Sequence, residues 1–317
     1  MDFIAQILAY PVRLIYNFIP NYGWTIIIFT IILKLATMPF TVKSQKSMAR
    51  MQQVQPLISE VQRKYANNRE KQQEELMKIY DKYDISPTGG CMPMILQLVI
   101  LMGFIQIVYK PYTFIKQIPK TAIASAITEL GEPLVEQAKE VGVNLSTLVN
   151  QQFEISKLPL LMDKLNLEAN SLNLDFFNID LTQVLKSNMS DWKCWILPVI
   201  ALILTVLSTF ISQRNANKKQ NENAKNDAQA QQAQAMTKSM YIMMPLMTAW
   251  ITYTMPLGCA LYWGISTLTQ IIQQFLVDQF VVKKMKPIEL KKKKKKTSAP
   301  KKEVEKEVIN VEENTED

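Results

Sequence analysis

One lysine, Lys34, lies inside the first long apolar stretch of the sequence, residues 22–40. A lysine at that depth in a membrane-spanning helix costs roughly 2.5–3.5 kcal/mol on insertion scales. The apolar stretches offer it no obvious carboxylate partner, since Asp278 lies near the far end of the last one. Either Lys34 serves a polar functional site, or its side chain snorkels across the six residues that separate it from Phe40.

Polar side chains recur at helical spacing around Lys34 and in the other apolar stretches. Thr30 and Thr37 fall on the face of Lys34, because they lie four residues before it and three after it. Serine and threonine in membrane helices often bond only to their own backbone, whereas glutamine is harder to place in lipid. Together the stripes predict a shared polar cavity. Its further candidate residues are Gln97, Gln106, Thr205, Ser208, Thr209, Ser212, Thr248, Thr252, Ser266, Gln270 and Gln273.

The residue types exclude several kinds of catalysis. The chain has no histidine, which removes His-ligand metal sites and Ser-His or Cys-His dyads. Cys91, Cys194 and Cys259 form no metal-type pair, and we expect them to be small buried apolar residues. The sequence contains neither a Walker A pattern nor an intramembrane carboxylate pair. We therefore predict that the protein is not an enzyme and uses no metal or cofactor.

Composition predicts an all-α, polytopic membrane protein. Of its 317 residues, 48% are hydrophobic and yet 20% are charged, which suits apolar spans that alternate with charged loops. An apolar helix of about 20 residues can cross a hydrocarbon core of roughly 30 Å. Five such transmembrane helices are expected, at residues 22–40, 92–110, 192–212, 240–256 and 257–280.

The segments outside the spans have distinct patterns. Residues 1–20 contain an amphipathic helix, which we interpret as lying at the extracytoplasmic interface; a short buried helix is the alternative. Residues 41–90 favour a cytoplasmic helical hairpin that turns at Asn67-Asn68. The remaining segments are an acidic loop at 111–191, a low-complexity loop at 213–239 and a disordered tail at 281–317.

Charge predicts the orientation of the chain in the membrane. The formal net charge is +8, and the basic residues concentrate in the 41–90 hairpin, the 213–239 loop and the tail. Because basic loops stay on the cytoplasmic side, the acidic 111–191 loop and the N-terminus are expected outside and the C-terminus inside. The N-terminal residues lack the pattern of a cleaved signal peptide or an organellar transit peptide.

Five short motifs follow one another along the chain. They are Asn21-Tyr22-Gly23-Trp24, Lys34-Leu35 with Met38-Pro39, the stretch from Ser47 to Pro56, Pro87-Thr88-Gly89-Gly90-Cys91-Met92-Pro93, and Pro256-Leu257-Gly258 with the glutamines of the last span. Together, in this order, they resemble the YidC/Oxa/Alb insertase family over nearly the whole chain. In that family a basic residue occupies a groove, and Lys34 falls at its position.

The resemblance implies a five-helix core around a hydrophilic groove that opens to the cytoplasm and to lipid. It implies an insertase and chaperone of the bacterial plasma membrane, which inserts nascent small membrane proteins alone or beside the Sec translocon. The hairpin, with Met48, Met51 and Pro56, is then expected to receive substrate. The chain lacks the large periplasmic domain of Gram-negative members, which indicates a Gram-positive-type protein, and we expect it to work as a monomer.

Two questions stay open at the level of sequence. A small anion transporter or channel would also use Lys34, as the binding charge, although such proteins usually show internal repeats and none is visible here. The six tail lysines, from Lys291 to Lys296, suit the phosphates of ribosomal RNA. The same run would also fix topology and contact anionic lipid.

Overall fold

The computed structural model of the protein describes residues 2–86, 92–167, 172–218 and 242–285. This described part is mostly helical, as the sequence predicts, and its two strands have two residues each. Several expected features lie outside the described residues. They are the loop at 87–90, Cys91, most of the 213–239 loop, and the tail with its lysine run.

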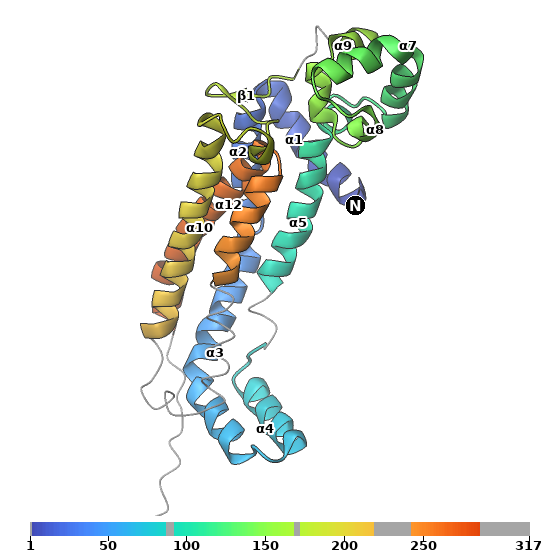
Figure 1. The fold of residues 1–317 in the computed structure, drawn as a ribbon. Coiled ribbons are helices and arrows are strands. Elements are labelled where there is room, and N and C mark those ends of the chain that lie inside the picture. Colours follow the sequence, from blue (N-terminus) through green and yellow to red (C-terminus); the bar gives the residue numbers. More distant parts are fainter. Residues whose placement is uncertain (1, 87–91, 168–171, 219–241, 286–317) are drawn as a thin grey trace, which may run out of the picture. The chain divides into compact units, whose positions relative to one another are not determined.

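Figure 1 shows the succession of elements. The first five helices are α1 (Asp2–Phe18), α2 (Tyr22–Ala36), α3 (Met38–Lys64), α4 (Arg69–Lys82) and α5 (Met92–Tyr109). Then follow α6 (Pro111–Phe114), α7 (Lys120–Glu140), α8 (Leu145–Leu148), η1 (Gln152–Lys157), α9 (Pro159–Lys164), β1 (Asp175–Phe176), β2 (Ile179–Asp180) and η3 (Leu185–Ser187). The last elements are α10 (Lys193–Lys218), a helix over residues 242–254, α12 (Leu257–Phe280) and η5 (Val282–Lys284).

Length and hydropathy single out few helices as membrane spans. Within the described residues, one helical segment, Lys193–Ser212 in α10, is long and apolar enough to cross a membrane by itself. Helices α2 and α3 meet the same criterion only when they are taken together as one bent span. Ile95–Tyr109 in α5 is apolar but shorter. The five expected spans therefore stay a prediction.

The first expected span is interrupted. Helix α2 ends at Ala36, and α3 begins at Met38 at an angle of 54° to it. Pro39 explains the break, because its nitrogen carries no hydrogen for the carbonyl of Leu35 and its ring clashes with that turn. The chain that was expected to reach Phe40 as one straight helix therefore turns at Thr37, and Lys34 lies in the last turn of α2.

Helices α3 and α4 form the helical hairpin. The turn between them contains Asn67 and Asn68, and the side chain of Asn68 accepts a hydrogen bond from the backbone nitrogen of Lys71 at 3.0 Å. Near the base of the hairpin, Arg50 forms an exposed ion pair with Asp84, with 3.0 Å between Nη1 and Oδ2. An exposed pair of this kind contributes about 0–1 kcal/mol, so it restrains the hairpin only weakly.

The segment after α5, expected as a loop, contains its own helices and core. Ile123, Leu134, Leu148, Ile155 and Leu161 are fully buried in it. The composition of this segment is acidic, but apolar residues at helical spacing still give α7 a buried face. Gly131, with φ +54°, breaks α7 into two pieces. The sequence reading of 111–191 as a plain loop thus missed this substructure.

A second part of the same segment, residues 172–185, runs against the ends of the long helices; we call it the strap. The backbone nitrogen of Tyr22 donates to the carbonyl of Asn173 at 2.9 Å. The backbone nitrogen of Gly258 donates to the carbonyl of Leu181, also at 2.9 Å. The strap therefore connects the start of α2 with the start of α12.

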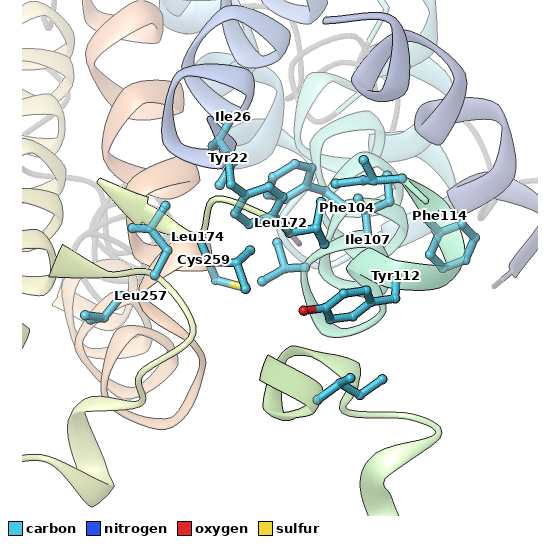
Figure 2. Close-up of a cluster of buried hydrophobic side chains, with 14 of the residues drawn as sticks. Tyr22, Ile26, Phe104, Ile107, Tyr112, Phe114, Leu172, Leu174, Leu257 and Cys259 are labelled. Carbon is cyan, nitrogen blue, oxygen red and sulfur yellow. The ribbon is translucent and has the colours of Figure 1, made fainter. Parts of the chain in front are cut away.

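Apolar packing holds the strap in place. Figure 2 shows Leu172 and Leu174 in one cluster of buried side chains with Tyr22, Ile26 and Cys259. Gly23 fits here because it has no side chain: a Cβ at this position would overlap the ring of Phe176. Cys194 and Cys259 are both buried free thiols, as the sequence predicts.

Candidate functional site

Lys34 is almost fully enclosed, with 8% of its surface exposed. It stands in the last turn of α2, where the carbonyl groups that lack helical partners concentrate partial negative charge. This end of the helix dipole favours a cation. The bend at Thr37 thus lowers the cost of placing a lysine in an apolar stretch, by ending the helix just beyond it.

The side chain of Lys34 has a neutral partner. Its Nζ donates a hydrogen bond to Oε1 of Gln97, from α5, at 2.9 Å. The amide nitrogen of Gln97 donates in turn to the hydroxyl oxygens of Tyr262 and Ser266, at 3.1 and 3.3 Å. Because a lysine can only donate, this arrangement fixes which end of the Gln97 amide faces it.

The backbone of Lys34 has a partner as well. Nε2 of Gln273, from α12, donates to the carbonyl oxygen of Lys34 at 2.7 Å. That carbonyl would bond to residue 38 in a continuous helix, but the helix has ended by then. Gln273 is 4% exposed, so its amide is committed to this bond. Lys34, Gln97, Tyr262, Ser266 and Gln273 are the Lys34 cluster.

Tyr262, a member of the Lys34 cluster, belongs to a stack of three aromatic rings. Tyr262 stacks on Phe104 with ring centroids 4.3 Å apart, and Phe104 stacks on Phe29 at 5.7 Å. These rings are fully buried. They belong to the same buried apolar cluster as Leu172 and Leu174 of the strap, and the hydroxyl of Tyr262 accepts from Gln97.

The charge of Lys34 is not neutralised by an acid in the described part of the chain. The ion pairs found there involve Arg50, Lys78, Lys157 and Lys164, all of them away from the cluster. The same part of the chain holds no group of three or more Cys, Asp or Glu residues that would bind a metal ion. Within the described residues, the partner of the Lys34 ammonium group is therefore the neutral amide of Gln97.

Three of the residues that the polar stripes predicted for the cavity lie in the Lys34 cluster. They are Gln97, Ser266 and Gln273. Most of the nominated threonines instead bond to carbonyls of their own helices. These are Thr30, Thr37, Thr205, Thr209, Thr248 and Thr252. For them the structure agrees with the simpler interpretation, that a hydroxyl in an apolar helix satisfies itself locally.

The other nominated residues lie apart from Lys34. Gln106 accepts from the ammonium group of Lys110 at 2.7 Å, at the other end of α5. Ser212 pairs with Gln274 near the C-terminal part of α12. Gln270 is exposed and Ser208 is half-buried. On the hairpin, Met48 and Pro56 are exposed and Met51 is half-buried.

Sequence reasoning missed two parts of the site. Tyr262 was not among the predicted site residues, although its place four residues before Ser266 puts both hydroxyls on one face of α12. The strap was not predicted, because the residues that it contacts, such as Tyr22 and Gly258, are far from it in sequence. No local pattern marks such a segment.

The comparisons with known proteins agree with this architecture. The profile described as "60Kd inner membrane protein" matches residues 14–286. The chain belongs to this family. Its members are integral proteins of the bacterial inner membrane, and the family is the YidC/Oxa/Alb family that the motifs indicated.

Individual relatives carry the name "Membrane protein insertase YidC". One from Caldanaerobacter subterraneus subsp. tengcongensis is 25% identical over 276 residues, which cover 87% of this chain and 94% of the relative. One from Nitratidesulfovibrio vulgaris is 39% identical over 126 residues, or 38% of this chain. One from Pelobacter propionicus is 35% identical over 159 residues, or 50% of this chain. The chain spans only about a quarter of the length of the last two, 24% and 27%.

Proposed function

We propose that this protein inserts small membrane proteins into the bacterial plasma membrane, alone or beside the Sec translocon. The observation that carries the proposal is the enclosed ammonium group of Lys34, whose partner is the neutral amide of Gln97. Its positive charge remains available to a passing acidic segment. The names of these relatives, which are membrane protein insertases, support the same conclusion.

The proposed mechanism is electrostatic. Two opposite unit charges 4 Å apart attract by about 4 kcal/mol at an effective dielectric constant of 20, before desolvation is counted. A hydrated groove lined by the Lys34 cluster would hold an acidic segment of substrate inside the membrane boundary and shorten its path across the apolar core. This step needs a charge and water, but no bond is made or broken.

The membrane arrangement that goes with this proposal has five spans, with the N-terminus outside and the C-terminus inside. Helix α1 supports its assignment to the outer interface. Its face with Ala5, Ala9 and Val12 is buried in the protein. A different face exposes large apolar side chains, and Gln6, Arg13 and Asn17 form a polar stripe between the two. The exposed apolar residues are Phe3, Ile7, Tyr10, Leu14 and Phe18. Such a helix suits the boundary between lipid and water.

The hairpin α3–α4 is the proposed receiver of substrate on the cytoplasmic side. Met48 and Met77 expose flexible, polarisable side chains there, with 47% and 56% of their surfaces accessible. Methionine surfaces adapt to many apolar sequences, which suits a protein with varied substrates. The tail lysines would contact either ribosomal RNA or anionic lipid. The protein is proposed to act as a monomer.

The test is insertion of a small membrane protein with an acidic translocated segment into liposomes that contain the purified protein. Lys34→Ala should reduce insertion about tenfold or more, and Lys34→Arg should retain most of it, since the electrostatic role needs only a cation. Lys139→Ala is the matched control, because Lys139 is an exposed lysine on α7, outside both the Lys34 cluster and the hairpin. Full activity of Lys34→Ala would refute the electrostatic mechanism. Lys34-dependent anion efflux without insertion would favour a channel.

A further inference from the structure

The tip of the short hairpin in the strap carries an exposed aromatic side chain in an unusual backbone conformation. Strands β1 and β2 pair Asp175 with Asp180 and Phe176 with Ile179, so Phe177 and Asn178 form the turn. Their φ angles are +51° and +59°. Glycine and asparagine accept these values in tight hairpins, but phenylalanine rarely does. Phe177 is nevertheless at the tip, with 75% of its surface exposed.

The protein holds this tip at a defined place. The side-chain nitrogen of Asn21 donates to the carbonyl of Asp175, and the backbone nitrogen of Asn173 donates to the hydroxyl of Tyr16, both at 2.9 Å. Phe176 packs beside Gly23 and is 8% exposed. The hairpin is thus attached to the end of α1 and to the first turn of α2.

The exposed ring of Phe177 lies beside Trp24. Their ring centroids are 6.3 Å apart, and Phe176 contacts both rings in edge-to-face geometry. Trp24 is itself 45% exposed. The packing of the protein therefore leaves an aromatic pair, Trp24 and Phe177, open to the surroundings at the start of α2.

This aromatic pair continues an apolar surface of α2. Trp24 is followed on the same helical face by Ile31 and Leu35, seven and eleven residues later, and both are exposed. The chain belongs to a family of integral inner-membrane proteins, so an exposed apolar stripe along an apolar helix faces lipid. The outward end of that stripe is Trp24, and tryptophan concentrates where acyl chains meet headgroups.

We infer that the tip of the strap hairpin, Phe177 beside Trp24, is a lipid anchor that inserts into the headgroup–acyl boundary of the outer leaflet. The occupant of this surface is phospholipid. An aromatic side chain in that layer gains apolar contacts while the polar backbone of the turn stays near water. This gain accounts for a phenylalanine at a turn position where its own conformation is unfavourable. The anchor requires membrane placement and is independent of the insertase reaction.

The experiment places the photoreactive residue p-benzoylphenylalanine at position 177 in the full-length chain, reconstituted in vesicles of phosphatidylethanolamine and phosphatidylglycerol. Asp175, exposed on the same hairpin and two residues away, is the matched control. Mass spectrometry after illumination should find a phospholipid adduct at 177 with a yield at least about fivefold above that at 175. Position 178 is a second tip site, for the case that the variant at 177 does not fold.

Two results would overturn the anchor. One is an equal lipid yield at the tip and at position 175, which would mean that the tip has no preferred contact with the bilayer. The other is a tip that gives no lipid adduct in pure vesicles but a protein adduct in native membranes. In that case the aromatic pair would be a docking site for another protein.

Discussion

The ammonium nitrogen of Lys34 lies 2.9 Å from the amide oxygen of Gln97, on a neighbouring helix. The amide nitrogen of Gln97 donates to the hydroxyls of Tyr262 and Ser266, and a flipped amide would turn that nitrogen against the ammonium group of Lys34, which can only donate. The pair therefore leaves the charge of Lys34 intact while keeping its position fixed.

Replacing Gln97 by glutamate tests this relationship. A carboxylate at 97 would form an internal ion pair with Lys34 and cancel the attraction for acidic segments. Insertion of a substrate with an acidic segment should fall about tenfold, while a substrate with a neutral segment is little affected. Gln97→Leu is the control for lost hydrogen bonding. Wild-type insertion by the Gln97→Glu protein would show that Lys34 does not act through its charge.

Gln273 is expected to stabilise the end of α2. The Lys34 carbonyl accepts from Gln273 at 2.7 Å and from the Thr37 hydroxyl at 3.3 Å. Gln273→Leu removes the shorter of these two bonds and should lower the free energy of unfolding by about 1 kcal/mol. Gln270→Leu is the comparison, since Gln270 lies three residues earlier on α12 and is exposed. Gln270→Leu should leave the midpoint temperature of thermal unfolding in mild detergent unchanged or raise it slightly. Equal effects of the two substitutions would contradict the capping role.

Gly23 should tolerate no side chain. Gly23→Ala places a methyl group into the ring of Phe176 and should destabilise the protein by about 1–3 kcal/mol, because neighbouring groups must move. Gly264→Ala in α12 is the matched helical control, since a Cβ there would lie 3.8 Å from Ala201, an ordinary contact. The unfolding midpoints of the Gly23→Ala and Gly264→Ala variants measure the two effects on stability. If Phe176→Ala does not rescue Gly23→Ala, the overlap is not the cause.

Asn68 should stabilise the second helix of the α3–α4 hairpin. Its side chain accepts from the backbone nitrogen of Lys71, so Asn68→Ala removes an N-terminal cap worth about 1 kcal/mol. Amide hydrogen exchange in the first turn of α4 should accelerate about fivefold. Asn67→Ala changes the adjacent asparagine, which is not the capping residue, and should leave the exchange rates as they are. Equal rates of amide hydrogen exchange in the Asn68→Ala and Asn67→Ala variants would exclude a capping role for Asn68.

The sequence was sufficient for some features and not for others. Local periodicity gave the helical class, the hairpin turn near Asn68 and the burial of Cys259, because each depends on near neighbours. The partnership of Lys34 with Gln97 joins residues 63 positions apart. Polar stripes could nominate Gln97 but could not separate it from Thr205 or Thr248, which satisfy their own backbones. That distinction depends on which helices pack together.

Because of the bend at Thr37, a small change of angle there would displace the far end of the hairpin by a much larger distance. Helix α3 has 27 residues, a length of about 40 Å, and begins about one turn after Lys34. A rotation of roughly ten degrees at the bend would move the far end of α3 by about 7 Å. The same rotation would pull on the turn that Gln273 holds. A chain caught by the hairpin would therefore exert torque on the residue that carries the charge.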